Sequence, residues 1–363
     1  MSTFSLHPAQ LLLLLPLALL LLSPPLTTAQ QPPAFTCRTR STCRALVGYI
    51  SPNTTTIGHI QTMFQIRTLR TLLGVNNLPP NTPPNHTVLG NSTVRIPFPC
   101  ICNNGTGISN RVPYYTVVQD DGLSHIAASV FSGLVEYNQI ATVNNITNVN
   151  LIFVGQRLWI PLPCSCDDVD GQQVVHYGHV VASGSNVSQI AADFGTRSET
   201  LMRLNNMTDP EQLIAGQVLD VPLRACNSSL RSSSPDSSML LSNGSYVYTA
   251  NNCVMCNCDA SNNYTLQCRP SGLSAMNWPT CPAMRCDAAN MSLGNSTTSS
   301  CNRSTCAYVG YNRETVLTDV IDENTCLAPG TDDSNQGPEV LWRGWSLAIV
   351  LLCLQVIMFQ RFL

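Results

Sequence analysis

Residues 143–166 read VNNITNVNLIFVGQRLWIPLPCSC, and the main features of this stretch occur three times in the chain. The closing IPLP of residues 160–163 has counterparts in IPFP at residues 96–99 and VPL at residues 221–223. A pair of asparagines also recurs, at Asn76-Asn77, Asn144-Asn145 and Asn205-Asn206. A period of about 60 residues that is seen three times indicates a tandem array.

Each repeat is predicted to run strand, helix, helix, strand. Short strands open the repeats at residues 46–50, 114–118 and 176–181. A helix with one buried face then follows, because apolar residues are spaced i, i+3, i+4 and i+7. These residues are Leu123, Ile126, Ala127 and Val130 in the second repeat, Val187, Ile190, Ala191 and Phe194 in the third, and Ile57, Ile60 and Phe64, with Gln61 at the fourth place, in the first. The second helix ends at the asparagine pair, since asparagine tolerates the left-handed conformation of a helix C-terminus.

The last strand of each repeat alternates between an inward and an outward face. The inward residues are Val94, Ile96, Leu158, Ile160, Leu219 and Val221, and the intervening Arg95, Trp159 and Asp220 are expected to point the other way. The two strands of a repeat can then pair antiparallel beneath its helices. Repeats of about 50 to 55 residues are small for an independent hydrophobic core, so cross-links between them are expected.

The two ends of the chain carry apolar runs. The leucine run at residues 11–22 precedes Pro24-Pro25 and the small residues up to Ala29, which predicts a secretory signal peptide over residues 1–29. A membrane helix is the alternative, but about 12 apolar residues fall short of the roughly 20 needed to span a bilayer. Residues 345–363 form a second apolar run after a polar spacer, residues 327–344, which is the layout of a GPI-attachment signal with Asp333 or Ser334 as the anchor site. A retained membrane helix is the alternative reading.

The 17 cysteines support removal of the C-terminal run. An odd number would leave one unpaired thiol in an oxidising compartment. The leftover residue is Cys353, which lies inside the apolar tail, so 16 cysteines remain for disulfides once the tail is gone.

Composition indicates a secreted protein with a neutral ligand. A net charge of −3 and 11% charged residues provide no basic field for nucleic acid. Thirteen Asn-x-Ser/Thr sequons are candidate glycosylation sites: Asn53, Asn85, Asn91, Asn104, Asn145, Asn186, Asn206, Asn227, Asn243, Asn263, Asn290, Asn295 and Asn302.

The order of elements, the asparagine pair, the Gly-Gln before the last strand (Gly155-Gln156, Gly216-Gln217) and the Ile-Pro or Val-Pro at its end resemble the LysM domain. Repeat one departs from the pattern, with Asn91-Ser92 in place of Gly-Gln. The chain also has Cys-x-Cys motifs between the repeats and the segments IPLPCSCD (residues 160–167) and YVYTANNC (residues 246–253). In these features it resembles plant GPI-anchored LysM receptors of the chitin elicitor-binding type. The resemblance implies an α+β fold of three LysM units, at residues 44–99, 112–163 and 175–225, after an N-terminal cysteine arm at residues 30–43.

The same resemblance implies a glycan groove between two loops in each unit. In unit two the first loop is Gln119, Asp120, Asp121, Gly122 and Leu123, and the second is Asn148, Val149, Asn150, Leu151 and Ile152. Ile152 falls where an apolar side chain contacts the N-acetyl group; the alternative is that it only packs under the loop. Sequons lie near the groove at Asn53 in unit one and at Asn186 and Asn206 in unit three, whereas unit two has only Asn145 at the helix end. Unit two is therefore expected to be the binding unit.

The resemblance further implies three disulfides, Cys37 to Cys102, Cys43 to Cys166 and Cys100 to Cys164, although six cysteines alone allow 15 arrangements. After Cys226, residues 227–245 are predicted to form a flexible Ser-rich linker. Residues 246–326 hold nine cysteines, which predicts a disulfide-stapled module acting as a spacer. A zinc site at Cys253, Cys256 and Cys258 is the alternative, disfavoured because no histidine follows His179.

The sequence thus predicts a non-catalytic receptor on the outer face of the plasma membrane, held by a lipid anchor and needing neither a cofactor nor a metal. Its expected ligands are chitin oligosaccharides. Its expected partners are a LysM receptor kinase, for innate immune signalling, and a second copy of the chain on a long oligomer. Peptidoglycan binding is the first alternative. A wall-glycan hydrolase is the second, and the few acidic residues after unit three and the absence of histidine there argue against it.

Overall fold

The computed structural model describes residues 35–38, 40–324 and 326. The signal peptide, the anchor residues Asp333 and Ser334 and the apolar tail predicted from the sequence lie outside these residues. Within the described part of the chain, no helix is long and apolar enough to cross a membrane. Among the described residues, one compact body comprises those up to Ser296 together with Thr305–Ile321, and a second comprises Thr297–Ser304 together with the described residues after Ile321.

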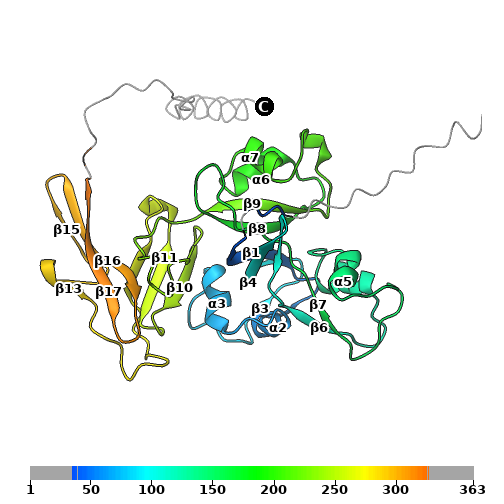
Figure 1. Cartoon of the computed structure of the whole chain (residues 1–363), viewed down its shortest axis with the longest axis horizontal. Coiled ribbons are helices and arrows are strands. Elements are labelled where there is room, and N and C mark those ends of the chain that lie inside the picture. The colour runs from blue at the N-terminus through cyan, green and yellow to red at the C-terminus, as the bar shows by residue number, and fades with distance from the viewer. Residues whose placement is uncertain (1–34, 39, 325, 327–363) are drawn as a thin grey trace, which may run out of the picture. The chain divides into compact units, whose positions relative to one another are not determined.

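All three repeats fold in the order strand, helix, helix, strand (Figure 1). Repeat one comprises β1 (Thr42–Ile50), α2 (Ile57–Met63), α3 (Leu69–Val75) and β4 (Thr93–Asn103), with a small β2–β3 ladder (Thr55–Thr56, Thr87–Val88). Repeat two comprises β6 (Tyr114–Thr116), α4 (Leu123–His125), which continues as the π-helical turn η1 (Ile126–Val130), α5 (Tyr137–Val143) and β7 (Arg157–Trp159). Repeat three comprises β8 (Val174–Val180), α6 (Val187–Asp193), α7 (Ser198–Leu204), η2 (Pro210–Gln212) and β9 (Val218–Arg224). In each repeat the first and last strands pair antiparallel.

The apolar faces predicted from the spacing are largely buried. Of the helix residues, only Gln61, Val130 and Phe194 are half-buried, and the inward strand residues are buried in all three repeats. Helices of only seven residues are unstable alone, so they depend on this packing. Phe64 of repeat one and Phe131 of repeat two meet edge to face with ring centroids 5.7 Å apart, which joins the cores of the two repeats.

The asparagine pair joins the second helix to the last strand. The second asparagine of each pair has a left-handed backbone, with φ of 51°, 55° and 54° at Asn77, Asn145 and Asn206. The first asparagine caps the helix. In repeat one, Asn76 Nδ2 donates to the carbonyl oxygens of Leu72 and Arg95, both at 2.8 Å, and its Oδ1 accepts from Arg95 N at 2.8 Å.

Repeats two and three reproduce the same three hydrogen bonds. Asn144 binds the carbonyl oxygen of Ile140 and both backbone groups of Trp159, at 2.8 to 2.9 Å. Asn205 binds the carbonyl oxygen of Leu201 and both backbone groups of Asp220, at 2.7 to 3.0 Å. In each repeat, the asparagine side chain therefore bonds the N–H and C=O groups of one residue of the last strand, as the backbone of a neighbouring strand would do.

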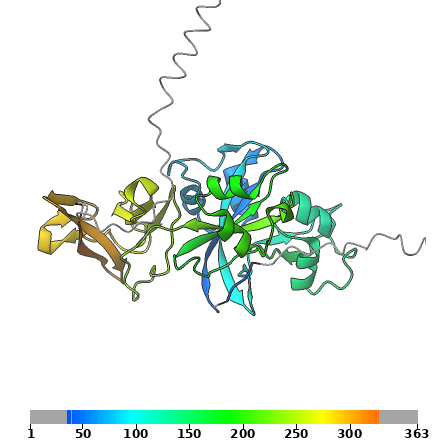
Figure 2. The same ribbon diagram turned by 90° about the horizontal axis from the view of Figure 1, so that it is seen from above.

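Repeats one and three share one sheet, which the sequence does not predict. Its strand order is β5-β4-β1-β8-β9, with β5 at Thr106–Ser109. Strands β4, β1, β8 and β9 lie next to one another in Figure 1, and the blue, cyan and green strands lie together in Figure 2. Strand β1 pairs parallel with β8 through Leu46 and Tyr177. Gly48 permits this contact, because a Cβ atom there would lie 2.0 Å from Tyr177 Oη. The β6–β7 pair of repeat two forms a separate sheet.

Asp220 corrects the predicted outward face of the last strand. Its side chain is 3% exposed and lies 2.8 Å from Nδ1 of His176, which is 2% exposed. Nε2 of His176 is 2.7 Å from the carbonyl oxygen of Asp167, so the segment after Cys166 covers this side of the sheet. Burial alone would lower the pKa of His176, but the Asp220 carboxylate raises it above its usual value.

Disulfides join the N-terminal arm and the repeats. Cys37 pairs with Cys102, Cys43 with Cys166, and Cys100 with Cys164, which are the partners that the resemblance implies. The last two of these bonds connect segments of repeat one with the end of repeat two.

The cysteine-rich segment folds into small sheets. Strands β10 (Ser245–Thr249), β11 (Val254–Cys258) and β12 (Gln267–Pro270) form one sheet, and β13 (Arg285–Cys286) and β14 (Met291–Ser292) form another. The remaining elements are β15 (Ser296–Ser299), β16 (Asn302–Tyr311), β17 (Val316–Asn324) and the turns η3 (Ala260–Asn262) and η4 (Asp287–Ala289). The disulfides are Cys226–Cys258, Cys253–Cys281, Cys256–Cys268, Cys286–Cys306 and Cys301–Cys326.

The Ser-rich segment predicted to be a flexible linker is instead fixed to this module. The Asp236 carboxylate accepts hydrogen bonds from Tyr308 Oη at 2.6 Å and Thr249 Oγ1 at 2.9 Å, and Ser234 is buried beside it. Arg231 N donates to the carbonyl oxygen of Val309 at 2.9 Å. The serine-rich composition predicts a flexible segment, but it gives no information about hydrogen bonds to residues that are distant in the sequence.

The module also packs directly on repeat one. Tyr246 is 6% exposed in the same core cluster as the first two repeats, and its hydroxyl donates to the carbonyl oxygen of Leu78 at 2.6 Å. Arg70 lies 5.9 Å from the ring centroid of Tyr248, within cation–π range. The first sheet of the module is therefore part of the folded body and not a separate spacer.

Candidate functional site

The two predicted groove loops of repeat two are joined at their base by backbone hydrogen bonds. Val117 N donates to the carbonyl oxygen of Gln156 at 2.9 Å, and Gly155 N donates to that of Val117 at 2.8 Å. The first loop begins after Val117 and the second loop ends at Gly155. The start of the first loop and the end of the second therefore lie next to each other. The fold brings the two predicted walls together.

Asp121 holds the first loop in shape and does not face solvent. Its side chain is 1% exposed, and its Oδ2 accepts from Val118 N at 2.8 Å and from Tyr115 Oη at 2.9 Å. Nδ1 of His125 lies 2.9 Å from its Oδ1. Burial alone would raise the pKa of Asp121, but the hydrogen bonds from Val118, His125 and Tyr115 outweigh it and lower that pKa. Burial and the hydrogen bond to Asp121 raise the pKa of Tyr115 to about 12, so the phenol stays a donor.

The other predicted residues divide into exposed and buried groups. Leu123 is 2% exposed in the core, so it is not available to a ligand. Exposed residues are Gln119, Asp120, Gly122, Asn148, Val149, Asn150 and Leu151. Ile152 is half-buried and packs against the core of repeats one and two, which leaves part of its side chain accessible.

Three exposed apolar residues beside these loops were missed by the sequence analysis. Phe153 is 62% exposed, Val154 is 70% exposed and Val118 is 54% exposed. Val118 and Val154 adjoin Val117 and Gly155, the hydrogen-bonded pair at the base of the loops. Phe153, Val154 and Leu151, which is 55% exposed, give the second wall an apolar surface suited to sugar faces and acetyl methyl groups, and Val118 adds an apolar residue at the start of the first wall.

A repeated signal in the sequence could have found Phe153. It begins a turn in which Gln156 N donates back to its carbonyl oxygen at 2.9 Å, and equivalent turns link Leu89 with Ser92 and Ile214 with Gln217. The first residue of each turn is apolar and exposed, at 65%, 62% and 65% for Leu89, Phe153 and Ile214. The third residue has positive φ at Asn91, Gly155 and Gly216, which explains why asparagine can replace glycine in repeat one. Among the three first residues of these turns, Leu89, Phe153 and Ile214, only Phe153 is aromatic.

Sequon asparagines adjoin the corresponding loops of repeat three. Asn186 is the N-cap of α6, where its Oδ1 accepts from Gln189 N at 2.8 Å. Asn206 is exposed at the end of α7. In repeat two, Asn145 is exposed at the end of α5.

A cleft of about 550 Å³ lies between repeats two and three. The segment between η1 and α5 forms one wall, and residues 205–207, 211–212 and 214–218 form the other. Its lining mixes apolar side chains with amides and contains the carboxylates of Glu136 and Glu211. No pattern in the sequence indicates this cleft.

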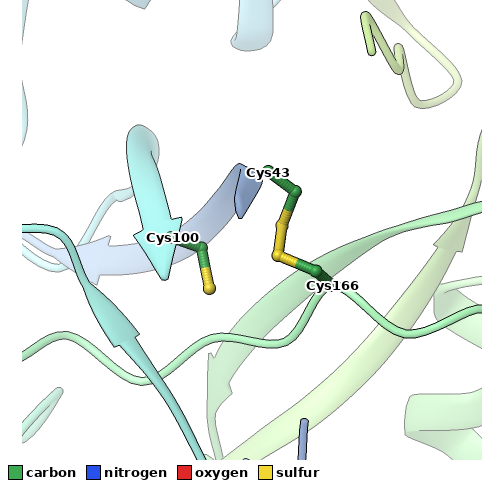
Figure 3. A group of neighbouring side chains, drawn as sticks. All are labelled: Cys43, Cys100 and Cys166. Carbon is green, nitrogen blue, oxygen red and sulfur yellow. A yellow bond between two sulfur atoms is a disulfide. The ribbon is translucent and has the colours of Figure 1, made fainter. Parts of the chain in front are cut away.

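A cluster of three sulfur atoms has the spacing of a metal site but a different chemistry. The Sγ atoms of Cys43, Cys100 and Cys166 lie within 4.8 Å of one another. Figure 3 shows the bond between Cys43 and Cys166, and Cys100 is bonded to Cys164. Disulfide sulfurs offer no thiolate ligand, and the same holds for Cys253, Cys256 and Cys258, the residues of the alternative zinc reading.

The buried pair His176 and Asp220 has the composition of part of a hydrolytic triad. Both side chains are at most 3% exposed, and the second ring nitrogen of His176 is held by a backbone carbonyl. A polymer substrate does not reach such a pair, so its role is to hold β8 and β9 to the segment after Cys166.

Comparison with known proteins places this geometry in a family. The family model of the LysM domain matches residues 115–161 and 179–222, which are repeats two and three. The chain is 49% identical over 333 residues to LysM domain-containing GPI-anchored protein 2 of Arabidopsis thaliana, covering 90% of this chain and 91% of that protein. It is 39% identical over 330 residues to the chitin elicitor-binding protein of Oryza sativa subsp. japonica, covering 88% of this chain and 91% of that protein.

A solved structure of the ectodomain of a receptor-like kinase is also similar. It shares 22% identity and a TM-score of 0.44 over 51% of this chain and 94% of its own.

Proposed function

Because the chain belongs to the family of LysM domain-containing GPI-anchored proteins, we propose that it is a cell-surface receptor that binds chitin oligosaccharides through repeat two. The observation that carries this proposal is the pair of loops joined at Val117, with the exposed Phe153 beside the half-buried Ile152. Such a shallow surface suits a neutral sugar polymer, which needs amide and backbone hydrogen bonds and apolar contacts but no ion pair.

The choice of repeat two rests on its exposed apolar residues and on its sequons. Repeat one also has the LysM element order, and we propose that it is a third LysM unit, with the unit boundaries given by the sequence. In repeat three, a glycan on Asn186 would crowd the first of the equivalent loops, whereas the first loop of repeat two contains no sequon; the helix-end sequons at Asn145 and Asn206 are common to both repeats. Asn145 of repeat two lies at the helix end, before the second loop.

Substitution of Ile152 tests the site. Ile152→Arg places a charge where the acetyl group is expected to pack, and we expect at least a tenfold loss of affinity for chitin oligomers by calorimetry, which is about 1.4 kcal/mol. Leu213→Arg at the equivalent position of repeat three is the matched control and should bind as the parent does. Parent-like binding by the Ile152 variant, with the control intact, would reject repeat two as the site.

Peptidoglycan is the alternative ligand, since its strands also contain N-acetylglucosamine. The chitin elicitor-binding protein among the relatives favours chitin. A pulldown on insoluble chitin and on peptidoglycan, side by side, decides between them. Preferential retention on peptidoglycan would replace the proposed ligand.

We propose that the chain is attached by a GPI anchor at Asp333 or Ser334 to the outer face of the plasma membrane. A chain anchored in this way needs a partner to signal across the membrane, and the partner we propose is a LysM receptor kinase, with immune signalling as the outcome. A long oligomer that bridges two ectodomains makes the second contact intramolecular, which raises avidity by about 10²- to 10⁴-fold. Mass photometry should show dimers with long but not short oligomers, and equal dimer formation by both would contradict bridging.

A further inference from the structure

The cleft between repeats two and three has a lining suited to an N-acetylated sugar. Ile214 supplies exposed apolar surface, the buried residues Leu134 and Val135 lie behind it in the lining, and the side chains of Gln139 and Gln217 supply amides. The charged side chains among its lining residues are the two carboxylates of Glu136 and Glu211, and the lining contains no arginine or histidine. Its volume of about 550 Å³ is in the range of small-ligand pockets.

A glycan attachment site lines the same cleft. Asn206 is the first residue of the sequon Asn206-Met207-Thr208, and its side chain is exposed at the cleft wall. Its neighbour Asn205 is buried and uses its amide to hold α7 to β9. A modification at this pair is therefore confined to Asn206.

N-linked glycans begin with two N-acetylglucosamine residues, and their attachment joins Asn206 Nδ2 to C1 of the first sugar. The oligosaccharide donor is a lipid-linked pyrophosphate, which leaves as the lipid pyrophosphate while Nδ2 loses one proton. We propose that the glycan on Asn206 folds back into the cleft and that its first two sugars bind there, holding repeats two and three together and closing the cleft to free oligosaccharides.

Tethering makes this contact favourable even if the cleft binds the sugars weakly. A ligand on a short tether has an effective concentration in the millimolar range. A cleft with a dissociation constant of about 0.1 mM would then be occupied roughly nine-tenths of the time. Glycan in the cleft is shielded from enzymes that act on its first bond.

Asn145 is the matched control because it is the equivalent residue of repeat two. Its φ of 55° is close to the 54° of Asn206, it is likewise an exposed sequon after a capping asparagine, and it does not line the cleft. The full chain, produced in a glycosylating eukaryotic host, is treated in its folded state with an amidase that releases N-glycans. Glycopeptide mass spectrometry then follows release at each site.

We expect release at Asn206 to be about tenfold slower than at Asn145, and the two rates to be equal after denaturation. Ala215→Trp fills the cleft from an exposed position without touching the sequon, and it should bring release at Asn206 up to the rate at Asn145. Equal rates in the folded parent would overturn the proposal. So would slow release that persists in the Ala215 variant, or an unmodified Asn206 in the secreted protein.

Discussion

At the scale of single residues, the Asp121 carboxylate determines the shape of the first loop. Its pKa is held below the usual value of about 3.9, so its charge stabilises the fold above that pH, and the contribution is lost as the pH falls through the lower folded-state pKa. Asp121→Asn should lower the free energy of unfolding by about 1 to 3 kcal/mol at pH 7, measured by urea denaturation. The difference from the parent should shrink below about pH 4.

Asp120 provides the control for that measurement. It is exposed with a φ of 67°, a conformation that asparagine tolerates, so Asp120→Asn should change the free energy of unfolding by less than about 0.5 kcal/mol. If both variants behave alike, or if the Asp121 deficit is independent of pH, the carboxylate does not hold the loop.

Phe153 is the residue whose aromatic ring we expect to contact the sugar. Phe153→Ala should weaken binding of chitin oligomers by about 1 kcal/mol, or roughly fivefold, because a ring of this exposure offers a flat face to a pyranose. Ile214→Ala, at the same turn position of repeat three, should leave affinity unchanged. Equal losses in the two variants would indicate that both repeats bind.

At the scale of elements, the first asparagine of each pair fastens a helix to a strand. Asn76→Ala removes three hydrogen bonds and leaves the backbone groups of Arg95 without their side-chain partner. We expect a loss of about 2 to 3 kcal/mol in the free energy of unfolding, measured by chemical denaturation. Asn77→Gly keeps the left-handed conformation, and neither residue lies in a sequon, so a change of about 0.5 kcal/mol or less is expected of this control. Similar losses in the two variants would argue against the fastening role.

The element order follows from local periodicity, and what periodicity leaves out is long-range. Spacing predicts the buried faces around Ile60, Ile126 and Ile190, and the asparagine pair marks the helix ends. Strand alternation placed Asp220 outward, because alternation carries no information about the segment after Cys166 that covers that face. The parallel contact of β1 with β8 and the burial of Asp121 likewise depend on residues distant in sequence or on side-chain geometry.

At the scale of the whole molecule, the cysteine-rich module is held to repeat one by a contact that only glycine allows. Gly74 lies in α3 against β10, and a Cβ atom there would be 2.1 Å from the carbonyl oxygen of Tyr246. In an isolated helix, Gly→Ala stabilises by about 1 kcal/mol. Here we expect the opposite sign, a loss of about 2 kcal/mol for Gly74→Ala, because backbone atoms on both sides must move apart.

Hydrogen exchange locates this effect. Amides of β10 should lose protection in the Gly74 variant, while those of β8 and β9 keep theirs, since repeat three does not contain the contact. Gly122→Ala, where an added Cβ meets open space, should change stability by less than about 1 kcal/mol and leave β10 protected. A Gly74 variant as stable as the parent, with β10 still protected, would mean that the module is an independent spacer after all, as its composition suggests.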